Sequence, residues 1–162
     1  MSSTSPPPRR TRRPRGSLTP EVILDAAEAV AAHGFDAFSM RAVAAHLGAV
    51  PMALYNHFST KELLVDALLD RVLSRFEPEP ATDDWAEDLA RFARAHRRLL
   101  VSHPWAVSPL FTQPNPGMSA VRIGEFALAL LRRGGLSTAD AVAAFSGIIA
   151  LNYGWSSFTA AR

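Results

Sequence analysis

Residues 39–61 could bind phosphate groups, because this stretch of 23 residues contains no aspartate or glutamate. It contains basic and amide side chains instead, namely those of Arg41, His46, Asn56, His57 and Lys61. A surface that neutralises phosphates must present such groups without acids beside them, since an acid would repel the polyanion. The composition therefore indicates a surface that faces phosphates, although many polar helical hairpins share this composition.

Catalytic and metal-binding patterns are missing from the sequence. There is no cysteine, which excludes thiolate catalysis, thiolate metal sites and disulfides. No glycine-rich phosphate loop, nucleophile elbow or His-Glu-x-x-His motif occurs, and no His-x-x-x-His pair offers a metal site. The adjacent Asp83 and Asp84 are better explained as the start of a helix than as paired catalytic carboxylates. We therefore expect a protein that is not an enzyme and that requires no cofactor or metal.

One uncharged segment, residues 141–161, has about the length of a membrane span. It contains two glycines, Asn152 and several hydroxyl side chains, so we favour a buried or interface helix over a membrane helix. A signal peptide is not expected either, because Asp25 and Glu28 interrupt the first apolar segment after the basic N-terminus. We therefore expect a cytoplasmic protein without a membrane partner.

Apolar residues recur at helical spacing from Thr19 to the end of the chain, and no segment alternates with period two. The sequence therefore predicts an all-α fold. A break at Glu77-Pro-Glu-Pro80 divides it into two expected domains, residues 19–76 and 82–162, which follow a disordered basic arm at residues 1–18. Caps and breakers predict helices that begin near Thr19, Ser39, Pro51, Ser59 (as a Ser-x-x-Glu capping box), Thr82, Trp105, Met118 and Ser137.

The segment 39–58 has the spacing of a helix-turn-helix. A short helix after Ser39 ends at Gly48, and another begins three residues later at Pro51. Such a unit needs apolar side chains on one side of both helices, and the sequence supplies Met40, Val43, Leu47, Leu54 and Phe58.

Three runs of residues in this region resemble a known family. They are Ser39-Met-Arg-x-Val-Ala-x-x-Leu-Gly48, Ala53-Leu-Tyr-x-His-Phe58 and Lys61-Glu-Leu-Leu64. Over residues 18–76 the chain is similar to the N-terminal DNA-binding domain of TetR-family transcriptional regulators. Residues 96–158 resemble, more weakly, the C-terminal domain of the tetracycline-repressor branch, through Leu-Leu-Val-Ser-His-Pro104 and Leu-Arg-Arg-Gly-Gly-Leu-Ser137. The resemblance implies a three-helix DNA-binding domain followed by a helical bundle for ligand binding and dimerisation.

The resemblance also implies which residues contact DNA. N-terminal residues of the second helix reach base edges in the major groove, where the apolar Met52 and Ala53 suit a thymine methyl group and Asn56 suits adenine. We expect Tyr55, His57 and Lys61 to contact the DNA backbone, although packing between the three helices is an alternative for Tyr55 and His57. The expected contacts with double-stranded operator DNA are Ser39, Arg41, Pro51, Met52, Ala53, Tyr55, Asn56, His57 and Lys61.

The N-terminal arm concentrates positive charge. Residues 1–20 hold five arginines and no acid, whereas the other 12 basic residues share the rest of the chain with all 15 acids. Arg12, Arg13 and Arg15 could lie in the minor groove next to the helix-turn-helix site. The alternative is a disordered, solubilising leader with only non-specific attraction to DNA.

The C-terminal half is expected to hold a small-molecule effector, because its side chains are mostly apolar and aromatic with few polar groups. The tetracycline repressor holds its metal-bound drug partly through a histidine that corresponds to Leu110 here, so we expect an apolar or aromatic effector rather than a metal chelate. The candidate contacts, each of which could also be plain core, are Phe92, His96, His103, Trp105, Phe111, Met118, Phe126, Phe145, Asn152 and Trp155.

The last helix is the expected dimer surface. Gly147, Leu151, Gly154 and Phe158 lie on one side of it, and two glycines inside a helix cost about 1 kcal/mol each unless another helix approaches closely. Family members usually have one or two further helices in this bundle, so we expect the second domain to be partial.

Taken together, these features predict a ligand-responsive repressor that binds a palindromic operator as a homodimer in the cytoplasm, at the nucleoid, and that a small apolar or aromatic effector releases. A helical interaction module that has lost DNA binding is the alternative.

Overall fold

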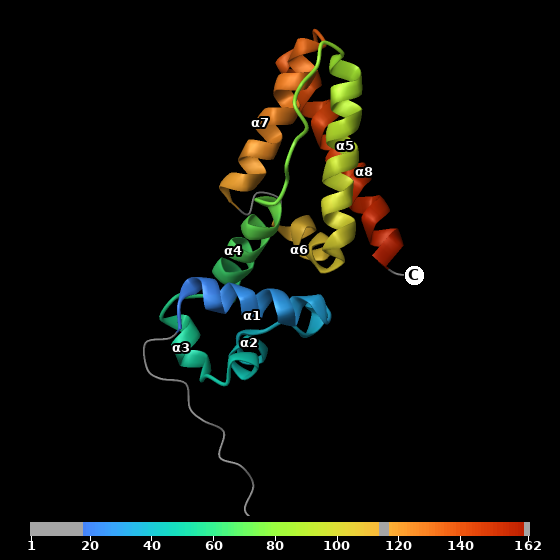
Figure 1. Cartoon of the computed structure of the whole chain (residues 1–162). Helices are drawn as coiled ribbons and strands as arrows, with labels where there is room; N and C mark the ends of the chain where they lie inside the picture. Colours follow the sequence, from blue (N-terminus) through green and yellow to red (C-terminus); the bar gives the residue numbers. More distant parts are fainter. Residues whose placement is uncertain (1–17, 114–116, 161–162) are drawn as a thin grey trace, which may run out of the picture.

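The computed structural model describes residues 18–113 and 117–160, which are helical apart from the connections between helices. This confirms the predicted all-α fold. Three helices form a small unit at one end of the molecule, namely α1 (Pro20–Ala32), α2 (Met40–Leu47) and α3 (Pro51–Tyr55) (Figure 1). Helix α4 (Lys61–Leu73) leads from it to the upper helices, which are α5 (Trp85–Ser102), α6 (Val107–Thr112), α7 (Met118–Arg133) and α8 (Thr138–Ala160). Two short 3-10 turns, η1 (Phe35–Ala37) and η2 (Pro104–Ala106), precede α2 and α6.

The first two helices begin as the sequence predicts. The Thr19 hydroxyl accepts a hydrogen bond from the Val22 N–H at the start of α1. The Ser39 hydroxyl accepts one from the Ala42 N–H at the start of α2. Gly48 ends α2 with a φ of +65°, in the left-handed region that favours glycine. The turn before α3 therefore has the helix-turn-helix geometry.

Two predicted caps are wrong by one or two residues. Helix α4 is capped by Thr60 rather than Ser59, because the Thr60 hydroxyl accepts a hydrogen bond from the Leu63 N–H at 3.2 Å. Helix α5 is capped by Asp84 rather than Thr82, because the Asp84 carboxylate accepts hydrogen bonds from two N–H groups in the first turn. In both cases the residue nearest to the first free N–H groups forms the cap.

Helix α3 is shorter than the apolar spacing predicts. It ends at Tyr55, so Asn56 and His57 follow the helix rather than lying within it. Leu54 is fully buried, and Phe58 is half-buried against the core, as predicted. Helix α3 therefore ends after little more than one turn, and Phe58 still packs against the core.

Helix α4 is bonded to α1 on one side. Arg75 donates hydrogen bonds to both carboxylate oxygens of Glu28, at 2.5 and 2.8 Å. Arg71 is paired with Asp25 and, at 3.6 Å, with Glu28. The hydrogen bonds from Arg75 hold the pKa of Glu28 below its usual value, although partial burial opposes this effect. These pairs fix the angle at which α1 crosses α4.

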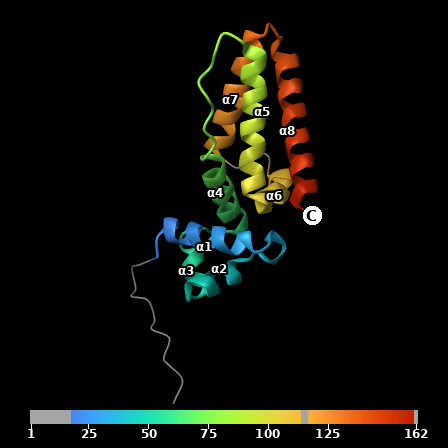
Figure 2. The ribbon, with the colours of Figure 1, turned by 45° about the vertical axis from the view of Figure 1, so that its right-hand side comes forward.

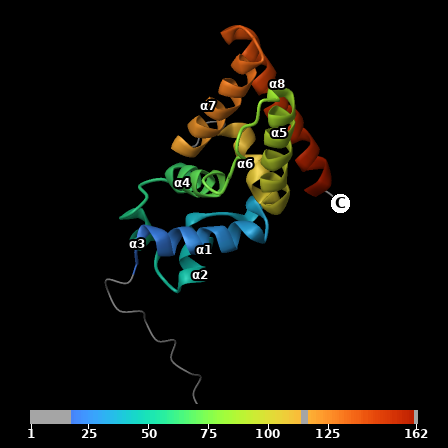
Figure 3. The same cartoon turned by 45° about the horizontal axis from the view of Figure 1, so that its top comes forward.

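The same helix is bonded to the upper helices on another side. The Asp70 carboxylate accepts a hydrogen bond from the Ser119 N–H at 2.7 Å, which satisfies one of the free donors at the start of α7. Gly117 lies beside it, and a Cβ there would lie 2.5 Å from Asp70 Oδ1, so any other residue would have to displace the Asp70 side chain. Figures 2 and 3 show α4 between α1 and the upper helices. The buried side chains accordingly form one continuous core that runs from Ile23 to Tyr153.

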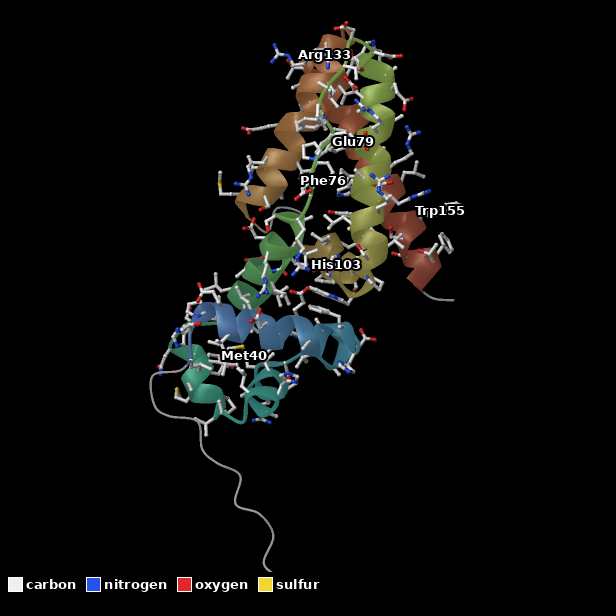
Figure 4. All side chains as sticks on the ribbon, viewed as in Figure 1. Met40, Phe76, Glu79, His103, Arg133 and Trp155 are labelled. Atoms are coloured by element: carbon white, nitrogen blue, oxygen red, sulfur yellow. The ribbon has the colours of Figure 1, made fainter. Side chains whose placement is uncertain are left out.

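A buried carboxylate holds the far end of the upper helices together. Asp88 of α5 accepts hydrogen bonds from Thr82, Arg91 and Arg133, the last of which belongs to α7 (Figure 4). Burial alone would raise the pKa of Asp88, but these hydrogen bonds outweigh it and hold the pKa well below its usual range. Thr82 therefore serves this network instead of capping α5.

Helix α8 packs on α5 and α7 along one side only. Ala141, Asn152 and Tyr153 are buried there, whereas Leu151 and Phe158 are exposed on the other side. Among the described residues, no helix has both the length and the apolar character that a membrane crossing requires. The long uncharged segment of the sequence is thus a half-packed helix of the bundle.

We expect the substitution Thr60→Ala to lower the free energy of unfolding by about 1 kcal/mol, because α4 loses its N-cap. The substitution Ser59→Ala is the matched control and should change it by less than about 0.5 kcal/mol. Urea unfolding followed by circular dichroism measures both. A larger loss for Ser59→Ala than for Thr60→Ala would contradict the assigned cap.

Candidate functional site

The helix-turn-helix presents an exposed surface without acids. Arg41 and His46 of α2 are exposed, and Asn56, His57 and Lys61 are exposed after α3 and at the start of α4. The apolar residues at the start of α3 are exposed as well, with Val50 at 60% and Met52 at 69% of full exposure. Apolar and basic side chains are therefore exposed side by side at the start of α3 and around it.

The remaining predicted DNA contacts lie on or beside this surface. Tyr55 is 42% exposed, and Pro51 and Ala53 are half-buried. Ser39 is half-buried with its hydroxyl oxygen engaged as the cap of α2. The Lys61 ammonium lies 5.9 Å from the ring centroids of Phe35 and Phe38, which holds its stem against η1. Arg12, Arg13 and Arg15 lie outside the described residues.

A second candidate site is a cavity of about 370 Å³ between the upper helices and the end of α4. This volume is within the range of small-molecule sites, roughly 300–1,000 Å³. Three of the ten predicted effector contacts line it, namely His96, Phe111 and Phe145. The rest of its described wall consists of Leu73, Leu110, Ala120, Ile123, Ser146, Ile149, Ala150 and Tyr153.

His96 is the most buried polar group of this wall. Its side chain is parallel to the ring of Phe92, with centroids 6.2 Å apart, and Nδ1 lies 3.1 Å from Asn152 Nδ2. Asn152 Nδ2 also donates a hydrogen bond to the Ala93 carbonyl at 3.1 Å. Burial lowers the pKa of His96 to about 4, so the imidazole is neutral at neutral pH.

Tyr153 faces the cavity beside His96. Its ring meets that of Phe111 edge to face, with centroids 5.5 Å apart, and lies 6.1 Å from the imidazole of His96. Burial raises the pKa of Tyr153 to about 12, so the phenol keeps its proton. The cavity therefore combines aromatic walls with three neutral hydrogen-bonding side chains, those of His96, Ser146 and Tyr153.

The other seven predicted effector contacts lie elsewhere. Asn152, Phe92 and Phe126 form a layer behind the wall, because Asn152 bonds to His96 and Phe92 lies between the rings of His96 and Phe126. Met118 is 66% exposed on α7, and Trp155 is 54% exposed on the outside of α8 (Figure 4).

His103 and Trp105 lie at the junction with α1 instead. His103 Nε2 accepts a hydrogen bond from Arg75 at 2.7 Å, and Trp105 stacks on Phe35 with ring centroids 6.4 Å apart. Both residues therefore connect the upper helices to the helix-turn-helix unit and do not line the cavity.

The cavity residues that sequence reasoning missed are mainly aliphatic. Leu73 comes from α4, in the half of the chain assigned to DNA binding, and Ala120 and Ile123 come from α7. Aliphatic residues at helical spacing look like ordinary core in a sequence. Tyr153 carried the one usable signal, since it follows the polar Asn152 in an otherwise uncharged helix.

The predicted dimer residues are exposed. Leu151 is 69% and Phe158 is 77% exposed, and a Cβ added at Gly147 or Gly154 would meet no atom within 4 Å. Nothing within the described chain therefore explains either glycine. In the part of the chain that the structure describes, no group of three or more histidine, aspartate or glutamate side chains could hold a metal ion.

We expect the free energy of unfolding to fall as the pH drops from about 6.5 to about 4, because an unfolded histidine binds a proton that buried His96 does not. The slope contributed by His96 is up to about 1.4 kcal/mol per pH unit, and His96→Phe should remove it. Asp88 loses its contribution to the free energy of unfolding at lower pH, below about 4. The pH ranges in which His96 and Asp88 act can therefore be distinguished. Urea titrations at a series of pH values measure the slope. An identical slope in wild type and His96→Phe would show that the buried imidazole is not its source.

Comparison with known proteins assigns the family. The model described as "Bacterial regulatory proteins, tetR family" matches residues 23–68, and the model "Tetracyclin repressor-like, C-terminal domain" matches residues 77–156. An "HTH-type transcriptional regulator" of Saccharopolyspora erythraea is 35% identical over 139 residues, which are 85% of this chain and 59% of that protein. The chain spans 52% to 59% of the length of three such curated relatives.

Two solved structures are similar along most of the chain. The crystal structure of BioQ with its double-stranded DNA operator has a TM-score of 0.79 at 29% identity and covers 90% of each chain. The Streptomyces coelicolor TetR family protein ActR, in complex with actinorhodin, has a TM-score of 0.79 at 28% identity and covers 91% of this chain and 71% of its own. These relatives are regulators, which agrees with the expectation that the chain is not an enzyme. The chain belongs to the tetR family of bacterial regulatory proteins.

Proposed function

We propose that the chain is a ligand-responsive transcriptional repressor, which binds a palindromic DNA operator as a homodimer in the cytoplasm. The observation that carries this proposal is the exposed, acid-free surface of α2 and α3. The structure of BioQ with its operator supports it, because that protein has the same fold and binds double-stranded DNA. A helical interaction module that has lost DNA binding is the alternative that the first experiment below tests.

The start of α3 would enter the major groove. Met52 projects from the first turn of α3 and is 69% exposed, so its thioether side chain can meet a thymine methyl group. Asn56 directly follows the helix, where its amide can reach adenine. Arg41 and Lys61 are exposed on either side of α3 and would hold phosphates.

Dimerisation would place two such surfaces about 34–36 Å apart, in successive major grooves. The outward side of α8 is the candidate interface, because Leu151, Trp155 and Phe158 expose an apolar surface there. Gly147 and Gly154 leave this side flat, which allows a helix of a second copy to approach closely.

Helix α4 would couple the cavity to the DNA-binding unit. Leu73 lines the cavity, and Arg71 on the same helix and Arg75 just after it bind Asp25 and Glu28 of α1. An effector that displaces Leu73 would therefore move α1 and change the spacing of the two α3 helices. The effector can shift this equilibrium only by its difference in affinity for the two spacings. The complex of ActR with actinorhodin supports a small-molecule effector for this fold.

We expect Lys61→Gln to reduce the slope of log K against log salt by about one, because one phosphate contact is lost. Asn56→Ala should instead remove about 1–3 kcal/mol of the binding free energy that distinguishes the base pairs at one position of the DNA site. It should leave the salt slope unchanged. Fluorescence anisotropy with duplexes selected from a random pool measures both effects. Deletion of residues 1–16 in the same titration tests the arginine arm. If the arm contacts phosphates, its deletion makes the salt slope less steep, whereas an unchanged slope excludes it from DNA binding.

Arg97→Gln on α5 is the matched control, since it removes one charge from an exposed position away from α3. Equal slopes for Lys61→Gln and Arg97→Gln would contradict the assigned DNA surface. If no duplex is selected, the chain does not bind DNA and the alternative function holds.

We expect Leu151→Glu to dissociate the dimer and to weaken binding to a palindromic operator by at least tenfold, because a charge replaces the centre of an apolar interface. Val101→Glu is the control, since Val101 is 50% exposed on α5. Sedimentation velocity gives the oligomeric state of both variants. A wild-type chain that sediments as a monomer at micromolar concentration would contradict the α8 interface.

A further inference from the structure

The polar groups of the cavity define the chemistry of the molecule that it would hold. This inference rests on the proposed effector site and concerns the class of effector. No charged side chain occurs in the described wall, so a charged ligand would lose its hydration without gaining an ion pair. Phe111, Phe145 and Tyr153 form aromatic walls, which favour a flat, aromatic ligand body.

The orientation of the Asn152 amide is fixed by its neighbours. The Ala93 carbonyl only accepts hydrogen bonds, so the Asn152 atom 3.1 Å from it is the amide nitrogen. The second N–H of this NH₂ group is directed to His96 Nδ1, also at 3.1 Å. A flipped amide would bring its oxygen against the Ala93 carbonyl oxygen and lose that bond.

This orientation determines which nitrogen of His96 carries the proton. Nδ1 must be unprotonated, because it accepts the hydrogen bond from Asn152. Since the buried imidazole is neutral, its single proton is on Nε2. The side chains of the cavity therefore include a donor whose tautomer is set by the protein before any ligand binds.

The Nε2–H group has no acceptor in the part of the chain that the structure describes. Within the described residues, no hydrogen bond engages His96 Nε2, and it is not among the buried side-chain atoms that lack a partner, so it remains accessible. Because His96 lines the cavity, a ligand oxygen is the acceptor that this donor lacks.

We propose that His96 donates a hydrogen bond through Nε2–H to a carbonyl oxygen of the effector, so that the cavity selects uncharged aromatic ketones or quinones. Asn152 acts as the positioning residue, since it holds the tautomer and does not touch the ligand. An aromatic compound of the same shape without a carbonyl binds more weakly, because it displaces water from the Nε2–H donor without offering an acceptor in its place.

Two probes of matched shape test this selection in the full chain. Alpha-tetralone is a bicyclic aromatic ketone, and tetralin has the same skeleton with a methylene group in place of the carbonyl. Titrations followed by ¹⁵N NMR give the dissociation constants of both probes for wild type and for His96→Phe. The ratio of the tetralin constant to the alpha-tetralone constant should fall by about two- to tenfold in His96→Phe, which is the effect of one hydrogen bond.

Phe145→Leu is the matched control, since it changes an apolar wall and should weaken both probes alike. An unchanged ratio in His96→Phe, with both probes still bound in the cavity, would overturn the donor role and leave the effector site intact. If neither probe perturbs the resonances of the cavity residues, the effector site itself fails, and this inference fails with it.

The tautomer can be measured without a ligand or a substitution. The ¹⁵N shifts of the two ring nitrogens of His96 in the wild-type protein distinguish Nε2–H from Nδ1–H. We expect the Nε2–H form at neutral pH. An Nδ1–H form would overturn the proposal, whatever the stability of the variants.

Discussion

Helix α4 has to satisfy partners on several sides at once, and the remaining structure depends on this constraint. Arg71 and Arg75 bind the carboxylates of α1, while Asp70 holds the first turn of α7. Between these polar contacts, Leu64, Leu68 and Val72 are fully buried and join the two units into one core. The helix cannot shift against one partner without disturbing the others, because packed interiors deform little. A displacement of α4 would therefore act on α1 and α7 together.

The contacts of α4 also explain why the junction is polar. Glu28 receives both N–H groups of Arg75, which in turn donates to His103, so three chain segments share one hydrogen-bonded cluster. The pairs are partly exposed, and such pairs contribute little to stability. Their geometric specificity matters more: a bidentate arginine fixes an angle between helices, which an apolar contact would leave free to slide. The stack of Trp105 on Phe35 adds an apolar contact beside this cluster.

The cavity places buried polar groups next to an apolar, aromatic wall. His96 and Asn152 are buried polar groups, and each would be costly without a partner. They are hydrogen-bonded to one another, and Asn152 also donates to the Ala93 carbonyl, which leaves the Nε2–H group of His96 without a partner among the described residues. The sequence placed both residues among the candidate effector contacts. It did not reveal that Asn152 stands behind His96, since that depends on the register between α5 and α8.

Much of the fold could be predicted from local patterns. The caps Thr19 and Ser39, the breaker Gly48 and the bounds of α7 follow from short-range hydrogen bonding and backbone preference, which are properties of a few adjacent residues. The acid-free surface of the helix-turn-helix could also be predicted, because the residue types give the charge at each position. The caps of α4 and α5 were misplaced because adjacent residues of similar chemistry competed for the same role.

Other features were decided only by tertiary structure. Thr82 is drawn away from α5 by Asp88, a residue that is buried because Arg133 of a distant helix neutralises it. Leu73 of α4 lines the cavity because that helix packs against helices that come later in the chain. Trp105 of η2 lies at the junction with α1 because it stacks on Phe35, which is far from it in the sequence. The sequence by itself determined which helices form and which surface carries basic groups without acids, since those depend on residues close together. Which side chains share a cavity depends on contacts between distant segments, and only the packed structure decides them.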